Sequence, residues 1–496
     1  MSSRSRTIAI VGAGFSGTAL AYRLLRGAHA APTRVVLIER ADNFGCGLAY
    51  SERAAGTTLN VPAGRMSIDE SQPDDLLDYL RSRDIPVTAE EFVPRTLYGE
   101  YLEAKLSSAA RLAPARVQLT RMRGIAIALN RNASNTLWSV ELDGGGGVLA
   151  DSVVLATGHC PPRPLPGVEA LVGTGLYEND PWQLSPSTSS QPARVLLIGT
   201  GLTMADVACR LARSAHPPQQ IVAISRRGLL PRYRLDKAPH AVAAPLDFGR
   251  LQAAVTLRAL VREVRALMQR AAAAGIDWRD VMVELRARAP GMWRRLSLAE
   301  RARFVRHVQP YWDVHRHQLP PLVARTLDEQ VERKRLRVRA ARIAGLRTVK
   351  GRVEVTLRSR GARTEETLVF DRIINCSGPD SDPSRAESRL MRMLFATGRL
   401  TACPTGTGLQ LDAAGRPINQ HGAAAPGLYY LGPWLRARDF EATAVQELRA
   451  QASVLSHRLL AEPLRPASGF LRRWLGLRSP IVETRPVEVR VPLRAR

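Results

Sequence analysis

Two short runs of apolar, β-branched residues in this chain each lead into a glycine-rich turn. The runs span residues 7–11 and 194–198, and apolar positions recur at helical spacing over residues 18–25 and 202–211. A fully apolar strand that turns directly into a helix is typical of a parallel sheet covered on both faces. The pattern therefore predicts two strand–turn–helix units, each starting a parallel sheet.

The first turn has the glycine spacing of a pyrophosphate-binding loop. Its first glycine permits the tight turn, its second lets the backbone approach a pyrophosphate, and its third lets the helix pack on the sheet, so that the anion rests on the helix N-terminus. The next strand, residues 34–39, ends in Glu39, whose carboxylate can accept hydrogen bonds from the ribose hydroxyls of an adenosine. The residues assigned to this site are Gly12, Gly14, Phe15, Ser16, Gly17, Glu39 and Arg40.

The second turn lacks the matching carboxylate. The strand that follows it, residues 220–225, runs into Arg226 and Arg227. A carboxylate would repel a 2′-phosphate, whereas a pair of guanidinium groups can bind one with two hydrogen bonds each. The second nucleotide is therefore expected to be NADPH, with NADH less favoured. The residues assigned to it are Gly199, Gly201, Thr203, Ser225, Arg226 and Arg227.

The order of elements repeats within the chain. Each turn is followed at a distance by a strand that ends in a small residue and a glycine, at residues 151–158 and 371–378. Each of these strands follows an alternating segment typical of a small antiparallel meander. Thr157, Gly158 and Gly378 therefore join the expected nucleotide sites. The predicted class is α/β, with two Rossmann-like dinucleotide-binding domains, small β-meanders and a helical insertion in the second.

Composition narrows the choice of partners. The 496 residues carry a net charge of +26. No basic run is interleaved with aromatic residues, so nucleic acid is not expected, although an anionic substrate or an acidic partner protein stays open. The five cysteines are scattered and form no Cys-x-x-Cys pair, which favours a reducing cytoplasm. No apolar run reaches the length that a membrane span requires.

The order of motifs resembles that of the two-dinucleotide-binding-domain flavoproteins. More closely, the chain is similar to a bacterial group of FAD/NAD(P)-binding proteins. Their nucleotide-binding domain is shared with flavin N-monooxygenases of the nitrosuccinate-forming aspartate hydroxylase type and with FAD-dependent urate hydroxylase-type proteins. The matching stretches are residues 47–50, 59–63, 92–95, 98–101, 156–159, 225–231, 277–279, 312–317 and 441–447.

The resemblance implies FAD at the first turn and the nicotinamide nucleotide at the second. It adds Tyr50, Asn60 and Gly432 as cofactor-binding residues. In related flavoproteins an Asp after the last of these glycines holds the ribityl chain, and Pro433 stands there in this chain. Backbone groups of Gly432 and the start of a helix expected from about Phe440 would take over that role.

The resemblance and the repeat together suggest the domain boundaries. The expected parts are residues 1–165 and 363–465 for an FAD-binding domain, 190–362 for an NAD(P)-binding domain with a helical insertion at about 240–330, and 466–496 for a basic tail. Apolar residues at helical spacing, from Leu251 through Val255 to Leu267, predict the first inserted helix. The inserted helices are expected either to cap the flavin site or only to thicken the core.

A flavin reduced by hydride transfer from NADPH can pass its electrons to a disulfide, to molecular oxygen or to a separate protein. A disulfide needs a pair of cysteines beside the flavin; Cys46 stands alone and is expected to be a buried structural thiol. The favoured interpretation is an FAD-dependent, NADPH-reduced monooxygenase that hydroxylates nitrogen or carbon of a small polar or anionic metabolite. The alternative is an electron-relay or reductase protein that serves a partner. No catalytic residue is assigned.

Four further residues have side chains that could ligate a metal ion: His307, Asp313, His315 and His317. A flavoprotein does not need that metal, and Pro310 and Trp312 predict an irregular connection, so no metal site is expected. The family resemblance implies instead that this cluster faces the substrate, with Arg316 able to bind a carboxylate. His159 is expected near the connection between the two nucleotide sites. A hydrolase is disfavoured because the chain has no Gly-x-Ser-x-Gly elbow.

Overall fold

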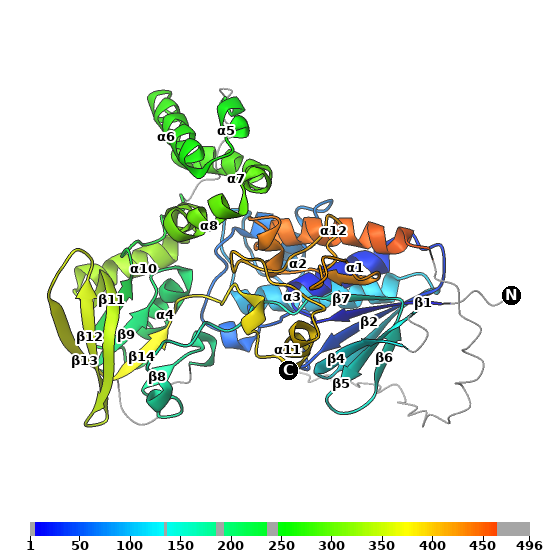
Figure 1. The fold of residues 1–496 in the computed structure, drawn as a ribbon, viewed down its shortest axis with the longest axis horizontal. Helices are drawn as coiled ribbons and strands as arrows, with labels where there is room; N and C mark the ends of the chain where they lie inside the picture. Colours follow the sequence, from blue (N-terminus) through cyan, green and yellow to red (C-terminus); the bar gives the residue numbers. More distant parts are fainter. Residues whose placement is uncertain (1–4, 133–135, 185–192, 236–246, 464–496) are drawn as a thin grey trace.

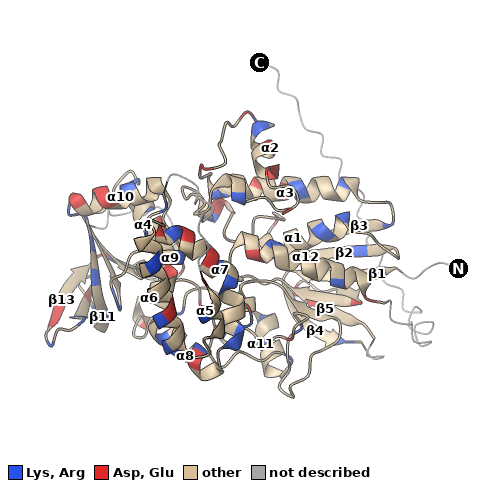
Figure 2. Cartoon of the chain, turned by 90° about the horizontal axis from the view of Figure 1, so that it is seen from above, with Lys and Arg blue, Asp and Glu red and all other residues tan. Residues whose placement is uncertain are grey.

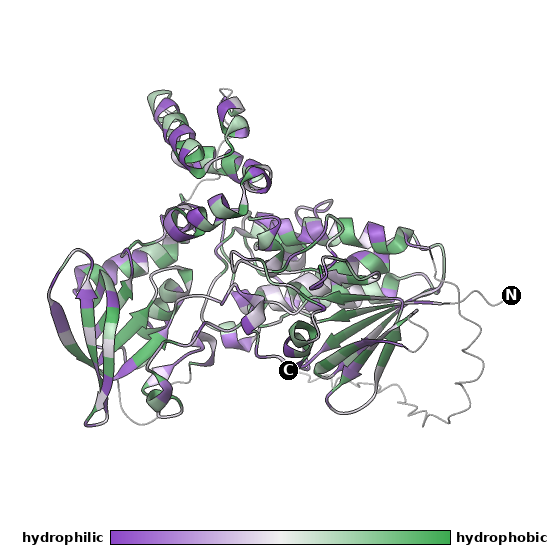
Figure 3. Cartoon of the chain, in the orientation of Figure 1, coloured by the Kyte–Doolittle hydropathy of each residue, from purple (hydrophilic) through white to green (hydrophobic). Residues whose placement is uncertain are grey.

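The computed structural model describes residues 5–132, 136–184, 193–235 and 247–463. Two sheets lie side by side, and a group of helices stands above the junction between them (Figure 1). Apolar residues fill the strands of both sheets, whereas the helices above the junction mix apolar and polar positions (Figure 3). This arrangement confirms the α/β class with two Rossmann-like units. The expected basic tail at 466–496 lies outside the described residues.

The first sheet is parallel, with the strand order β15-β7-β1-β2-β3. Its strands are β1 (Arg6–Val11), β2 (Thr33–Glu39), β3 (Val117–Arg123), β7 (Ser152–Leu155) and β15 (Leu428–Tyr430). Helices α1 (Phe15–Arg26), α3 (Arg95–Leu112) and α12 (Val445–Ala461) cover one face (Figure 1). Because β15 pairs with β7, the chain returns to this sheet after it has built the second one.

The second sheet has the order β13-β12-β11-β10-β9-β14-β8. Its strands are β8 (Tyr177–Glu178), β9 (Arg194–Ile198), β10 (Gln220–Ser225), β11 (Leu336–Val349), β12 (Arg352–Ser359), β13 (Glu365–Phe370) and β14 (Arg372–Asn375). Helices α4 (Leu202–Ala212) and α10 (Pro321–Glu332) pack together against its central strands. The order β14-β9-β10 repeats the order β7-β1-β2 of the first sheet, so each glycine turn leaves a strand that lies between two parallel neighbours.

The two meanders join their sheets differently. In the first half, β4 (Ala126–Arg131), β5 (Trp138–Leu142) and β6 (Gly147–Ala150) form a separate antiparallel sheet. In the second half, β11 pairs with β10 at its start and with β12 further along, so the meander is continuous with the parallel sheet. A register shift between Ile343 and Gly345 interrupts the β11–β12 pairing, as a β-bulge does.

The inserted helices form a small core of their own. They are α5 (Gly249–Ala253), α6 (Leu257–Ala273), α7 (Trp278–Arg295), α8 (Leu298–His307) and α9 (Gln309–Arg316). Helices α5 and α6 point away from both sheets (Figure 1). Leu267, Val281 and Leu285 are fully buried among them. The insertion therefore has a hydrophobic core that is separate from the core of the second sheet.

Three local expectations were wrong. Val255 lies between two helices and is 59% exposed, because α5 ends at Ala253 and the Thr256 side chain caps a new helix at the Ala259 amide. Residues 309–316 form α9 instead of an irregular connection, since Pro310 stands in its first turn, where proline is tolerated. The last helix begins at Val445, after the expected Phe440, which is buried against the inserted helices.

The remaining elements are short. They are α2 (Asp75–Arg81), α11 (Arg389–Ala396) and the 3-10 helices η1 (Glu52–Ala54), η2 (Ala63–Arg65), η3 (Glu169–Leu171), η4 (Pro181–Gln183), η5 (Pro383–Arg385) and η6 (Pro433–Ala437). Over the described part of the chain, none of the helices combines the length and the apolar character needed to cross a membrane.

Candidate functional site

The first turn requires glycine at two positions for steric reasons. A Cβ on Gly12, whose φ is +106°, would lie 2.3 Å from the carbonyl oxygen of Ala156 at the end of β7. A Cβ on Gly17 would lie 1.9 Å from the carbonyl oxygen of Gly12, so the helix can approach the turn only without a side chain there. The turn opens at the carboxyl ends of β1 and β7, which is where open α/β sheets bind ligands.

The groups around this turn fit a pyrophosphate. Gly14 is the N-cap of α1 and offers no side chain to satisfy the first amides of the helix. The hydroxyl oxygen of Thr157 is buried, and no described residue forms a hydrogen bond with it. A Cβ on Gly158, whose φ is +70°, would meet no atom within 4 Å. Helix amides that no capping side chain satisfies suit an anion.

Glu39, the ribose ligand expected from the sequence, lies beside the turn. Its Oε2 accepts a hydrogen bond from the backbone amide of Ala13 at 2.7 Å, and its Oε1 accepts one from the amide of Arg40 at 2.9 Å. Each carboxylate oxygen has further acceptor capacity. The backbone thus holds the carboxylate in place while leaving acceptor positions for ribose hydroxyls, and the Arg40 side chain is exposed.

The second turn repeats the geometry of the first. A Cβ on Gly199 would lie 2.2 Å from the carbonyl oxygen of Cys376, which follows β14 as Ala156 follows β7. A Cβ on Gly201 or on Gly378 would meet nothing within 4 Å. Thr203 lies in the first turn of α4, for which Gly201 is the N-cap. The second turn therefore shares with the first the close approach of its leading glycine to a neighbouring strand and a glycine N-cap, whereas Met204 stands where the first turn has Gly17.

The expected 2′-phosphate ligands differ in what they contact. Ser225 accepts hydrogen bonds from Thr200 and from the amide of Gly228, both at 2.9 Å, so its hydroxyl holds the loop in shape. Arg227 lies 4.7 Å from the ring centre of Tyr311 and is thereby turned toward the inserted helices. Arg226 is exposed. Among the described residues, no carboxylate pairs with either arginine.

The remaining expected cofactor residues fall in two places. The Tyr50 ring packs edge to face on Tyr98 at 4.8 Å, and burial raises the pKa of the Tyr50 hydroxyl. A Cβ on Gly432 would lie 2.7 Å from the hydroxyl of Tyr430. Asn60 lies elsewhere, in the lining of a small cavity where the first sheet's domain, the second sheet's domain and the inserted helices meet. The structure therefore groups Asn60 with residues that the sequence did not connect to it.

We call this cavity the arginine pocket. Four guanidinium groups, the start of a helix and three side-chain amides surround it. Its lining residues are Asn60, Val61, Arg65, Met66, Arg234, Arg286, Arg316, Gln318, Ala444, Val445 and Gln446. Arg316 was predicted from the sequence as a carboxylate ligand, whereas the other three arginines were missed. No spacing signal marked them, because the arginines come from separate parts of an arginine-rich chain.

Glu441 holds the wall of the arginine pocket together. Its Oε2 accepts from Nε of Arg316 at 2.7 Å and from Nε of Arg286 at 3.3 Å, and its Oε1 accepts from the indole of Trp312 at 2.8 Å. Burial alone would raise the pKa of this carboxyl, but the two guanidinium charges and the hydrogen bonds hold it below its ordinary value. Arg286 also donates to Glu447 of α12 at 2.6 Å.

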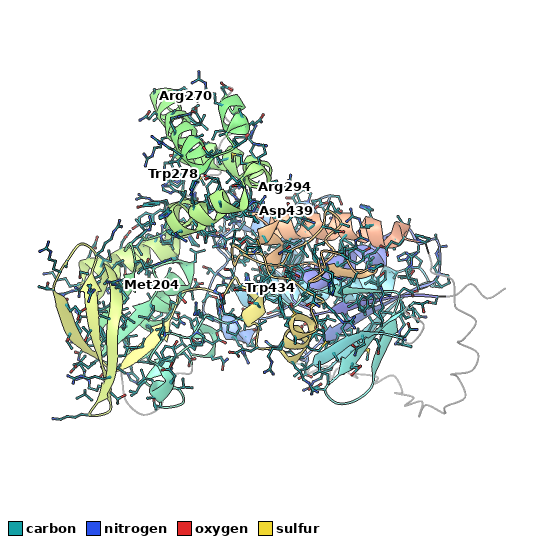
Figure 4. All side chains as sticks on the ribbon, viewed as in Figure 1. Met204, Arg270, Trp278, Arg294, Trp434 and Asp439 are labelled. Carbon is teal, nitrogen blue, oxygen red and sulfur yellow. The ribbon has the colours of Figure 1, made fainter. Side chains whose placement is uncertain are left out.

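A second group of contacts anchors the insertion to the first domain next to the pocket. The indole of Trp293 donates to the carbonyl of Ala437 at 2.9 Å, and Trp293 stacks on Phe440 with ring centres 4.7 Å apart. Arg294 pairs with Asp439 at 2.7 Å, and the two labelled residues lie next to each other in Figure 4. Seen from above, α7 and α9 lie beside the start of α12, with acidic and basic residues close together (Figure 2).

The possible metal ligands do not converge. His315 bonds through Nδ1 to the carbonyl of Tyr311 at 2.7 Å, and His317 lies 4.0 Å from Asp313. Throughout the described ranges, no group of three or more His, Cys, Asp or Glu side chains is placed to hold a metal ion.

Two other residues singled out in the sequence lie near the first turn. His159 follows β7 at the mouth of that turn and is exposed. Cys46 is buried, as expected for a structural thiol. Burial raises the pKa of the Cys46 thiol to about 11, so it is a poor nucleophile at neutral pH.

Comparison with known proteins finds a matching family model and solved structures of similar fold. Residues 9–160 match a family model described as FAD-NAD(P)-binding. No curated protein matches the sequence. The ornithine hydroxylase of Pseudomonas aeruginosa, in its reduced form, superimposes with a TM-score of 0.61 at 16% identity, over 92% of this chain and 99% of that one.

Two other solved structures have the same fold. FAD-bound cadaverine monooxygenase of Erwinia amylovora superimposes with a TM-score of 0.61 at 12% identity, over 93% of this chain and 96% of that one. The ornithine N-hydroxylase of Kutzneria, with reduced FAD, NADP+ and L-ornithine, gives 0.58 at 15% identity, over 92% and 99%. This chain has the fold of the two-dinucleotide-binding-domain flavoproteins. The family model covers the first glycine turn.

Proposed function

We propose that this protein is an FAD-dependent monooxygenase, reduced by NADPH, that hydroxylates nitrogen or carbon of a small polar metabolite. One observation carries the proposal: two glycine turns, at Gly12 and Gly199, each approach the end of a neighbouring strand closely and open at the carboxyl ends of parallel strands. The solved structures of an ornithine hydroxylase and a cadaverine monooxygenase match the chain over more than nine-tenths of its length, which supports the same assignment.

We assign FAD to the first turn. The backbone from Gly12 to Gly17, the N-terminus of α1 and the unpaired hydroxyl of Thr157 would hold the pyrophosphate, and Glu39 would accept from the ribose. Tyr50, Asn60 and Gly432 complete the proposed contacts. When bound, the flavin supplies electron transfer from NADPH to dioxygen, chemistry that amino-acid side chains lack.

We assign NADPH to the second turn. The backbone from Gly199 to Gly201 and the N-terminus of α4 would bind its pyrophosphate, with Thr203 and Gly378 beside it. Arg226, which is exposed and has no carboxylate partner in the described ranges, would bind the 2′-phosphate, and Arg227 would move off Tyr311 to assist. The corresponding domains are 1–165 with 363–465 for FAD and 190–362 for NADPH.

The proposed cellular setting rests on the cysteines. All five are free and buried in the described residues, as befits a protein kept in a reducing cytoplasm. The same observation supports oxygen over a disulfide as electron acceptor. An acidic partner protein as acceptor is the competing function, and a turnover assay separates the two.

The test is a spectrum followed by that assay. The purified protein should show flavin absorbance, or acquire it on reconstitution with FAD, and should oxidise NADPH faster than NADH. Removing oxygen should stop the reaction. Protein that stays colourless with added FAD would overturn the proposal, and oxidation that proceeds without oxygen only when an acceptor protein is added would replace it with the electron-relay function.

A further inference from the structure

The arginine pocket carries more positive charge than nearby carboxylates balance. Glu441 and Glu447 pair with Arg286 and Arg316. Across the described ranges, no carboxylate pairs with the other two arginines of the lining, Arg65 and Arg234. The cavity therefore faces guanidinium charges that have no counterion in the part of the chain that the structure describes.

Two polar atoms in this lining are also unsatisfied. Nη2 of Arg316 and Nε of Arg234 are buried and have no hydrogen-bond partner among the described residues. A buried donor without an acceptor lowers the stability of the folded protein. These donors point to a ligand that supplies acceptor atoms.

The backbone adds a partial positive charge to the same cavity. Helix α12 runs for 17 residues from Val445, and its N-terminus forms part of the lining. Its N-cap is Ala444, which has no side chain able to accept from the first amides of the helix. The positive end of the helix dipole therefore faces the same cavity as the guanidinium groups.

The arginines also act on one another. Burial lowers the pKa of Arg234 to about 10, and the charges of the three other arginines in the lining act in the same direction. Arg316 is held in place nonetheless, because its side chain is only 7% exposed and its Nε is fixed on Glu441. A bound anion would offset this repulsion and supply the missing acceptors.

We propose that the arginine pocket is the substrate's anion site, and that it takes a small organic dianion held by carboxylate or phosphate oxygens. This inference rests on the proposed monooxygenase function. The pocket suits a substrate site because its arginines come from the first domain, the second domain and the insertion, so a ligand there touches all three. None of the residues of either glycine turn lines it, so it is separate from both expected pyrophosphates.

The same charge pattern excludes a class of ligand. A diamine such as the cadaverine of the Erwinia amylovora enzyme carries two positive charges. Four guanidinium groups and a helix N-terminus would repel it. The fold is therefore shared with enzymes of cationic substrates, while the pocket of this chain selects the opposite charge.

The test compares two variants with a neighbouring control. Arg234→Gln and Arg65→Gln each remove a guanidinium that has no carboxylate partner in the described ranges, whereas Arg232→Gln changes an exposed arginine outside the pocket lining. Succinate, inorganic phosphate and cadaverine serve as probes, and calorimetry on the FAD-loaded protein gives each Kd. Succinate and phosphate distinguish the two kinds of anion.

We expect the wild type and Arg232→Gln to bind at least one of the two anions and to ignore cadaverine. Both pocket variants should weaken that binding about tenfold or more, the effect of losing one charge-assisted hydrogen bond. Equal affinity in Arg234→Gln and Arg232→Gln, or tighter binding of cadaverine than of succinate, would overturn the anion site.

The FAD content of each variant shows whether the pocket binds the substrate or the cofactor. It should be unchanged, and a loss of FAD in Arg234→Gln would assign the pocket to the cofactor and overturn the substrate site. The calorimetry is therefore repeated on protein without FAD: wild type that binds succinate but neither FAD nor NADPH would leave the anion pocket standing while the proposed monooxygenase function fails.

Discussion

Arg316 and Glu441 form an ion pair of 2.7 Å in which the two side chains are only 7% and 3% exposed. Glu441 precedes α12 in the first domain, whereas Arg316 ends α9 of the insertion, and Arg286 of α7 reaches the same carboxylate. Glu441 is the carboxylate that pairs with Arg316 among the described residues, whereas Arg286 also pairs with Glu447 at 2.6 Å. The pair fixes one wall of the arginine pocket and joins two parts of the chain that are distant in sequence.

Glu441→Gln should destabilise the protein strongly. The amide keeps the shape of the side chain but removes the charge, which leaves Arg316 buried without compensation; breaking a buried pair in this way costs about 3–5 kcal/mol. Urea unfolding measures the loss. The control is Glu329→Gln, which removes an exposed ion pair with Arg333 and should cost about 1 kcal/mol or less. Equal losses in the two variants would contradict the role given to Glu441.

The same carboxylate should make stability depend on acid pH. Its pKa is lower in the folded chain than in the unfolded one, where a Glu titrates near about 4.3. The stabilisation is therefore fully present above the unfolded value and is lost as pH falls through the folded value. The gap in unfolding free energy between wild type and Glu441→Gln should narrow on acidification, from about pH 6 towards about pH 3. A gap that widens instead would reverse the sign of the shift.

Gly12→Ala should abolish binding of FAD. The new Cβ would lie 2.3 Å from the carbonyl oxygen of Ala156 at a φ of +106°, so the turn must move away from the proposed pyrophosphate position. The ratio of flavin to protein absorbance after reconstitution reports the loss, and circular dichroism reports the fold. Gly144→Ala, whose Cβ would meet no atom within 4 Å, is the matched control and should keep the flavin.

Arg226→Ala should weaken NADPH without affecting NADH. The 2′-phosphate is the only group that distinguishes the two nucleotides, and losing a charge-assisted hydrogen bond to it should raise the KM for NADPH about tenfold. Steady-state oxidation of both nucleotides gives the comparison. Arg250→Ala, an exposed arginine of α5, should change neither value. Equal weakening of both nucleotides would refute the assignment of Arg226.

Sequence patterns predicted the structure correctly where the conformation of a segment depends on its own residues. The apolar runs before the glycine turns were confirmed as β1 and β9, because such strands are buried on both faces and their glycines are required by sterics. Periodicity failed where a cap overrode it, at Thr256. It also failed where a proline was expected to break the helix although it occupies a first helical turn, at Pro310.

By itself the sequence determined the α/β class, the two glycine turns and the opposite charges that follow them, at Glu39 and at Arg226 with Arg227. Those features depend on neighbours in the chain and on backbone sterics. Only the tertiary structure brought four arginines around one cavity with the start of α12. The physical reason is that a charge field depends on distances in space, and in an arginine-rich chain no spacing distinguishes an arginine in the pocket from one on the surface.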